Sequence, residues 1–89
     1  MMQHNLVIVK PGALEAVGTA GNEMAKDPEG IKNDFVPKSD LVLHATKLID
    51  PQATAILRFK APLTPGEYPY VCTFPGHWVI MNGVMDVKP

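Results

Sequence analysis

The sequence lacks the features that mark several large classes of protein. Apolar runs such as Leu6 to Val9 are far too short to cross a bilayer, which takes about 20 residues. The 8 Lys and Arg residues are scattered among 9 Asp and Glu, so no basic stripe can follow a phosphate backbone and nucleic acid is excluded as a partner. The single cysteine, Cys72, cannot form an internal disulfide. The 89 residues predict one small domain, in which a bound metal or a covering partner would add materially to stability.

Short strands account for most of the predicted regular structure. Continuous or alternating runs of β-branched, aromatic and other apolar residues predict strands over 5–10, 53–60, 67–72 and 84–88. A brief extended segment is predicted over 41–43. Pro and Gly residues lie between several of these runs and mark turns. The pattern favours a fold built mainly from β-strands.

One helix is predicted among the strands. Apolar residues recur at helical spacing over 13–26, although Gly18 and Gly21 each weaken a helix by about 1 kcal/mol. Residues 27–40 are rich in Pro, Gly, Asn and Asp and predict a surface loop. Several short strands with one marginal helix predict a β-sandwich in which the helix is an insertion.

The chemistry is concentrated in one segment near the C-terminus. A lone cysteine is most often a small buried apolar residue, but the neighbours of Cys72 change that interpretation. A tight turn at Pro75-Gly76 follows it, so His77 and then Met81 can face the same point as the sulfur. A thiolate, an imidazole and a thioether are soft ligands, which favour copper over calcium or magnesium. The segment therefore predicts part of a copper site.

A trigonal copper site needs one more nitrogen ligand. Either His4 or His44 could complete a plane of two histidines and one cysteine, and spacing alone does not choose between them. His4 precedes a strongly apolar strand, and the next residue, Asn5, has a side chain able to hydrogen-bond across to the cysteine loop. His44 lies beside a polar loop. The physical context favours His4.

Four sequence elements together carry a resemblance to a known family. They are His4-Asn5 before an apolar strand, His44 with Thr46-Lys47-Leu48-Ile49, Pro65-Gly66-Glu67-Tyr68, and Cys72-Thr-Phe-Pro-Gly-His77 followed by Met81. In these elements the chain resembles the azurin and auracyanin branch of the cupredoxins. The resemblance implies an all-β, cupredoxin-like Greek-key β-sandwich with one short inserted helix.

The resemblance also predicts that part of the sandwich is missing. In the family, further strands precede the His-Asn strand, whereas this sequence has three residues before His4. Residues 1–89 are therefore interpreted as a single but partial cupredoxin domain without its N-terminal strands. A longer polypeptide, another chain or a remodelled fold would account for this, and we favour a fragment of a longer protein. An uncovered apolar strand at Leu6 to Val9 would invite association with those strands or with another chain.

The resemblance implies a ligand set for one copper ion. His4, Cys72 and His77 match the three strong ligands of the family, and Met81 matches the weak axial ligand. The backbone carbonyl of Gln3 matches a distant group on the opposite axial side. Copper in such a site changes between Cu+ and Cu2+ with little rearrangement.

Other residues take their expected roles from the same resemblance. Asn5 and Thr73 match the pair that ties the two ligand-bearing segments together, a device that holds the sulfur in place. His44 matches a histidine that is not a ligand. Trp78 departs from the smaller residues expected after the second histidine, and either widens an apolar contact face or caps the loop. The expected electron-transfer surface around His77 consists of Met2, Phe74, Pro75, Gly76 and Ile80.

The function implied is a type 1 (blue) copper electron carrier and not an enzyme. It would shuttle single electrons between redox proteins such as a cytochrome or an oxidoreductase, in the periplasm or another extracytoplasmic compartment. Two alternatives remain open: a cupredoxin domain of a larger oxidoreductase, and a non-redox metal-binding or structural module. A two-copper centre is disfavoured, because it needs a second cysteine and the chain has only one.

Overall fold

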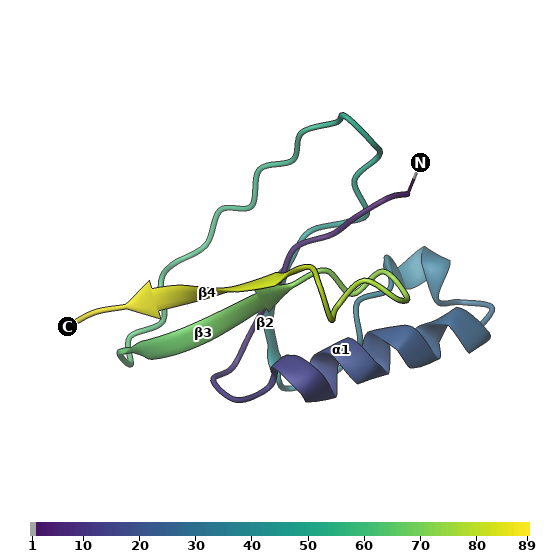
Figure 1. Ribbon diagram of the computed structural model, residues 1–89. Coiled ribbons are helices and arrows are strands. Elements are labelled where there is room, and N and C mark those ends of the chain that lie inside the picture. Colours follow the sequence, from purple (N-terminus) through teal and green to yellow (C-terminus); the bar gives the residue numbers. More distant parts are fainter. Residues whose placement is uncertain (1) are drawn as a thin grey trace.

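A four-stranded antiparallel sheet is the centre of the fold in the computed structural model, which describes residues 2–89 (Figure 1). Its strands are β1 (Val7–Val9), β2 (Val42–Ala45), β3 (Gly66–Val71) and β4 (Asn82–Val87), arranged in the order β2-β1-β3-β4. The short β1 is therefore an inner strand, hydrogen-bonded on both edges. Four of the five extended segments predicted from the sequence correspond to these strands.

The helix α1 (Leu14–Glu23) covers one face of this sheet (Figure 1). Successive side chains of a strand point to opposite faces, and Val7, Val9 and Val71 all point to the face that α1 covers. They pack with Ala13 and Val17 into the buried core, where each of the five is at most 4% exposed. The predicted helix over 13–26 is confirmed, since α1 continues directly into a 3-10 turn, η1 (Met24–Lys26).

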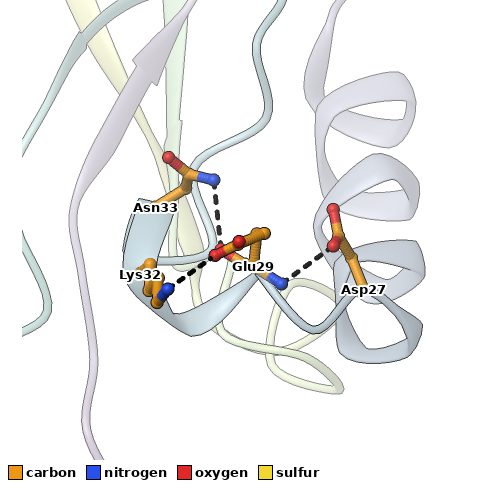
Figure 2. Close-up of polar contacts among 4 residues, drawn as sticks. All are labelled: Asp27, Glu29, Lys32 and Asn33. Carbon is orange, nitrogen blue, oxygen red and sulfur yellow. Dashed lines mark hydrogen bonds and ion pairs between the residues drawn. The ribbon is translucent and has the colours of Figure 1, made fainter.

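The segment after α1 is more ordered than a surface loop. Its second 3-10 turn, η2 (Ile31–Asn33), is preceded by Asp27, whose carboxylate accepts a hydrogen bond of 2.8 Å from the Glu29 N–H (Figure 2). The Asn33 side-chain amide donates to the Glu29 carbonyl at 3.0 Å, and Lys32 lies 3.2 Å from the Glu29 carboxylate (Figure 2). These local contacts favour a compact turn, which returns the chain to the sheet.

The strand predicted over 53–60 is wrong. The segment has no regular secondary structure, within residues 2–89 it pairs with no strand, and Ile56 is 71% exposed. After Ile49, which is hydrogen-bonded to His4, the connection from β2 to β3 arches away from the sheet on the side opposite α1 (Figure 1). The alternating pattern has the period of a strand, but a strand also needs a neighbour for its backbone hydrogen bonds. Within this segment Phe59 contacts the sheet, where its ring stacks on His44 of β2 with centroids 4.7 Å apart.

The sheet face opposite α1 is apolar and only partly covered. Leu6, Ile8, Phe59, Tyr70 and Met85 line an apolar hollow of about 220 Å³ on this face. Leu6 is 36% exposed and Tyr70 is 38% exposed. Residues 2–89 form one sheet, so the described chain supplies no second sheet to face it. We call this surface the open face.

No helix in residues 2–89 is both long and apolar enough to cross a membrane.

Candidate metal centre

Three potential metal ligands converge from separate parts of the chain. His4 precedes β1, and its backbone is fixed by two hydrogen bonds to Ile49, of 3.1 and 2.7 Å. Cys72 follows the last residue of β3, and His77 lies in the loop between β3 and β4. The Cys72 N–H donates to the Met81 carbonyl at 2.9 Å and so closes the base of that loop. One end of the sheet thus brings all three residues together.

The donor atoms are spaced as a single metal ion requires. Nδ1 of His77 lies 3.5 Å from the Cys72 sulfur, and Nδ1 of His4 lies 3.8 Å from it. All three donor atoms lie within 4.8 Å of one another. A trigonal ion with bonds of about 2.0 Å to nitrogen and about 2.3 Å to sulfur would separate N and S by about 3.7 Å. The chain therefore presents a trigonal set of two nitrogens and one thiolate sulfur.

Burial favours the metal-binding form of His77. Cys72 is 4% exposed and His77 is 9% exposed. Burial lowers the pKa of His77 below the ordinary value of 6.5, and the positive charge of a protonated His4 lowers the same pKa further. Their rings are close, with centroids 5.0 Å apart. The neutral imidazole of His77, which is the metal-binding form, is favoured.

The two residues expected along the axis of the site lie near it but have less defined roles. Met81 is 36% exposed, and its side chain lines the same surface hollow as Cys72. Gln3 donates a side-chain hydrogen bond of 2.7 Å to Asp50. The axial roles of the Met81 thioether and the Gln3 carbonyl stay predictions.

His44 lies apart from this cluster. It belongs to β2, pairs with Ile8 across the sheet and stacks on Phe59 on the open face. In the described residues, the three potential ligand atoms that lie close together belong to His4, Cys72 and His77. Strand register therefore brings His4 and not His44 to the end of β3, beside Cys72.

Asn5 and Thr73 join the two segments that carry the ligands. The Asn5 side-chain amide donates to Thr73 Oγ1 at 2.8 Å, and its oxygen accepts from the Thr73 N–H at 2.8 Å. Asn5 is 5% exposed and Thr73 is 1% exposed, so water does not compete for this pair. Each residue is the direct neighbour of a ligand, His4 or Cys72, which fixes the distance between the two ligand backbones.

Two further residues support the site without a clear signal in the sequence. The backbone carbonyl of Asp34 accepts a second hydrogen bond from the Asn5 side-chain amide, of 2.9 Å, and the Asp34 carboxylate accepts from the Leu48 N–H at 3.0 Å. Phe35 packs edge-on against Phe74 with ring centroids 5.3 Å apart. Both have positive φ, 56° and 52°. Aspartate tolerates this conformation better than most residues, which is the one hint available in a segment expected to be a surface loop.

The outer edge of His77 is surrounded by apolar groups. The sulfur of Met2 lies 3.1 Å from Nε2 of His77, and the ring of Phe74 lies 4.7 Å from the imidazole. Met2 is 60% exposed and Ile80 is 82% exposed. One nitrogen of His77 thus faces Cys72, while the other faces an apolar surface.

Comparison with known proteins identifies the family. A model of copper binding proteins of the plastocyanin/azurin family matches residues 1–88. The chain belongs to this family. It is 37% identical over 90 residues to an azurin of Achromobacter denitrificans, an alignment that covers 98% of this chain and 57% of that protein. This blue copper protein thus spans little more than half the length of that azurin relative.

Solved structures of cupredoxins share its fold. An azurin of Methylomonas sp. strain J gives a TM-score of 0.80 at 27% identity, covering 99% of this chain and 67% of that one. A dithionite-reduced auracyanin of Roseiflexus castenholzii gives 0.76 at 38% identity, covering 99% and 68%. The predicted cupredoxin-like fold, mostly sheet with one short helix, is confirmed. So is the predicted cofactor: this cupredoxin has a site for one copper ion, and its nitrogen and thiolate donors fit that ion.

Proposed function

We propose that this cupredoxin is a one-electron carrier whose copper ion is held by His4, Cys72 and His77. Met81 would supply a weak thioether ligand, and the Gln3 backbone carbonyl would offer a more distant oxygen. The observation that carries the proposal is the convergence of two Nδ1 atoms on one buried sulfur, at 3.5 and 3.8 Å. Copper bound there supplies a Cu+/Cu2+ couple, which transfers single electrons without bond making in a substrate.

The protein's own contribution is to keep the ligands in place during the change of charge. The reciprocal bonds of Asn5 and Thr73 fix the backbones beside His4 and Cys72. The bonds from Cys72 N–H to Met81 O, and from Met81 N–H to His77 O, both 2.9 Å, fix the loop. A donor set that cannot relax toward either oxidation state suits electron transfer and not enzymatic chemistry.

Electrons would enter and leave through the outer edge of His77, the side of the ring that bears Nε2. The apolar surroundings of its outer nitrogen allow close and brief contact with another redox protein, such as a cytochrome or an oxidoreductase. The surface that we assign to this contact consists of Met2, Phe74, Pro75, Gly76 and Ile80.

We further propose that residues 1–89 are one partial cupredoxin domain whose open face is covered in the working protein. This proposal is supported by the apolar hollow that Leu6, Ile8 and Tyr70 line on an otherwise well-packed sheet. Apolar surface of this kind is stabilised by burial at about 25 cal/mol per Å². Further strands, from the same polypeptide or from another chain, would bury it.

The relation to azurins and auracyanins also supports a location outside the cytoplasm, in the periplasm or another extracytoplasmic compartment. Cell fractionation followed by detection of the chain tests this location. Recovery in the cytoplasmic fraction would contradict it.

Copper bound to the Cys72 thiolate is expected to give an intense blue thiolate-to-copper absorption band. Reversible bleaching of this blue band tests the proposed electron transfer. The copper-loaded protein is reduced with ferrocyanide or a stronger one-electron reductant, and then reoxidised with ferricyanide. We expect one electron per copper and full recovery of the band over repeated cycles. Incomplete recovery, or loss of copper on reduction, would contradict a carrier function.

The proposed contact surface is tested separately, with a matched pair of variants. Ile80→Asp places a charge beside His77, whereas Leu63→Asp places one at a remote position that is 99% exposed. We expect Ile80→Asp to slow electron transfer to a soluble cytochrome about tenfold and Leu63→Asp to leave it unchanged. Equal rates for the two variants would exclude this surface.

A further inference from the structure

We propose that helix α1 positions the copper loop through one face of the helix, formed by Gly18, Gly21 and Asn22. These residues contact the loop at Thr73, Gly76 and Trp78, on both sides of the ligand His77. We call this set of contacts the helix clamp. It rests on the proposed function only in its effect on the redox potential, because the contacts themselves are present in the polypeptide alone.

The first contact is a hydrogen bond from the loop to the end of the helix. The Gly76 N–H donates to Asn22 Oδ1 at 2.8 Å. Gly76 has a φ of +87°, which glycine adopts readily, and it directly precedes His77. The next peptide is also fixed, because the His77 N–H donates to the Phe74 carbonyl at 3.0 Å. Asn22 therefore anchors the turn that carries the ligand.

The second contact is a close approach of the helix backbone to Thr73. A Cβ atom on Gly21 would lie 2.7 Å from the Thr73 carbonyl oxygen and 2.9 Å from Thr73 Cβ. No side chain fits at this position without moving the backbone of the residue that follows Cys72. Gly21 thus allows α1 to support Thr73 on one side while Asn5 holds it on the other.

The third contact is between Gly18 and the indole of Trp78. A Cβ atom on Gly18 would lie 2.3 Å from Cγ of Trp78 and 2.8 Å from its Cβ. Trp78 also packs against the core cluster under the sheet. The indole therefore caps the loop against the helix, and the residue after His77 is held as firmly as the residue before it.

The spacing of these residues explains why one helix can make all three contacts. Positions 18, 21 and 22 are three and four residues apart, so they lie on a single face of α1. Both glycines weaken a helix intrinsically, yet both are buried here against the loop. The two glycines lower the helix propensity of α1, but they allow this face of the helix to approach the ligand loop closely. These contacts therefore position His77 in the copper-free protein.

Variants of Asn22 test the clamp directly. Asn22→Leu removes the acceptor at similar size, Asn22→Asp keeps an acceptor oxygen, and Thr19→Ala is a control on an exposed position of the same helix. We expect amide hydrogen exchange at Gly76 in the copper-free protein to rise about tenfold in Asn22→Leu. Asn22→Asp should restore slow exchange, and Thr19→Ala should not change it. Unchanged exchange in Asn22→Leu would overturn the proposal.

The same variants carry a readout on the copper-loaded protein. A positioning residue should shift the reduction potential and the position of the blue band when it is removed, whereas a merely structural one should leave both in place. We expect Asn22→Leu to shift both and to weaken copper binding about tenfold. Asn22→Asp should bring binding back toward the wild-type value. A wild-type potential and band in Asn22→Leu would contradict the clamp.

A pair of substitutions tests the contact with Trp78. Gly18→Ala places a methyl group against the indole and should lower the thermal midpoint by several degrees, while Gly18→Ala combined with Trp78→Leu should recover part of the loss. Additive effects would show that the two positions are not in contact.

The outcomes separate the clamp from the proposed function. If wild-type protein cycles reversibly but Asn22→Leu matches it in exchange, potential and colour, the clamp fails and the carrier function stands. If Asn22→Leu speeds exchange at Gly76 but wild-type protein does not cycle, the clamp stands and the carrier function fails.

Discussion

The side chains on the two faces of the sheet are buried to very different degrees. On the face covered by α1, Val7, Val9 and Val71 are fully buried, and the copper loop is fixed by contacts at several points. On the open face, Leu6 and Tyr70 keep more than a third of their surface exposed. The metal site therefore depends on the face that α1 covers, which we call the closed face. The described chain can therefore hold the side chains of this site in place even though the opposite face of the sheet is only partly covered.

Substitution of Asn5 should cause the largest loss of stability and of copper affinity. Asn5→Ala deletes three buried or half-buried hydrogen bonds, two to Thr73 and one to Asp34, and leaves their partners unsatisfied. We expect a loss of about 3 kcal/mol in the free energy of unfolding and a tenfold to hundredfold loss of copper affinity. Urea unfolding and competitive copper titration measure the two effects.

The matched control for this change is Asn33→Ala. It removes an exposed side-chain hydrogen bond to the Glu29 carbonyl and should cost less than about 1 kcal/mol. Equal losses for the two variants would show that the bonds of Asn5 have no special importance.

A pair of truncations compares the two faces directly. Val71→Ala removes methyl groups from the closed core, where the side chain is fully buried, and should cost about 2 kcal/mol. Ile56→Ala removes more apolar volume on the opposite side but from a side chain that is 71% exposed, and should cost less than about 0.5 kcal/mol. Thermal unfolding of both variants checks the contrast. A larger effect for Ile56→Ala would mean that the open side contributes more to stability than its burial indicates.

A charge on the open face shows whether that face is covered. Leu6→Lys should change the stability of the isolated chain by less than about 0.5 kcal/mol, because Leu6 is 36% exposed. It should also reduce self-association, measured by sedimentation, since a lysine on such a surface blocks sheet pairing. In the working protein, with the face covered as proposed, the same substitution should be strongly destabilising. Equal effects in both settings would argue against a cover.

The smallest expected effect is the loss of stability at low pH that arises from protonation of His77. Its pKa is lowered by burial and then by the nearby His4, so below pH 6.5 the unfolded chain binds more protons at this residue than the folded, copper-free protein does. The contribution to stability is therefore complete above the unfolded pKa and is lost as the pH falls through the lowered pKa of the folded state. Urea unfolding at several pH values measures it, with His77→Gln as the reference. The same pH slope in both proteins would contradict this assignment.

The sequence was informative where chemistry is local and less so where it depends on pairing. The spacing of Cys72, His77 and Met81 identified the copper loop, because a loop of this length brings its own ends together. The choice between His4 and His44 required the register of β1 against β2 and β3, which periodicity does not encode. Residues 53–60 have the alternation of a strand but pair with none in the described chain.

Side chains that act from a distant segment were the least predictable. Asn22 reaches Gly76 from 54 residues away, and nothing in the local pattern of the helix distinguishes it from any exposed asparagine. Gly18 and Gly21 seemed to weaken the helix, because propensity describes an isolated segment and not the close packing of that segment against a loop. The choice between the two roles expected for Trp78 depends on its contact with Gly18, which the sequence pattern does not show.

Titration with Cu(II), followed by the visible spectrum, is the most direct test of the ligand set. Because Cys72, His4 and His77 converge on one point, wild-type protein should develop an intense blue thiolate-to-copper band that saturates at one copper per chain. Cys72→Ser should abolish the band, and His44→Ala should leave it nearly unchanged. A wild-type protein that stays colourless with copper bound, or a band that survives Cys72→Ser, would contradict the account.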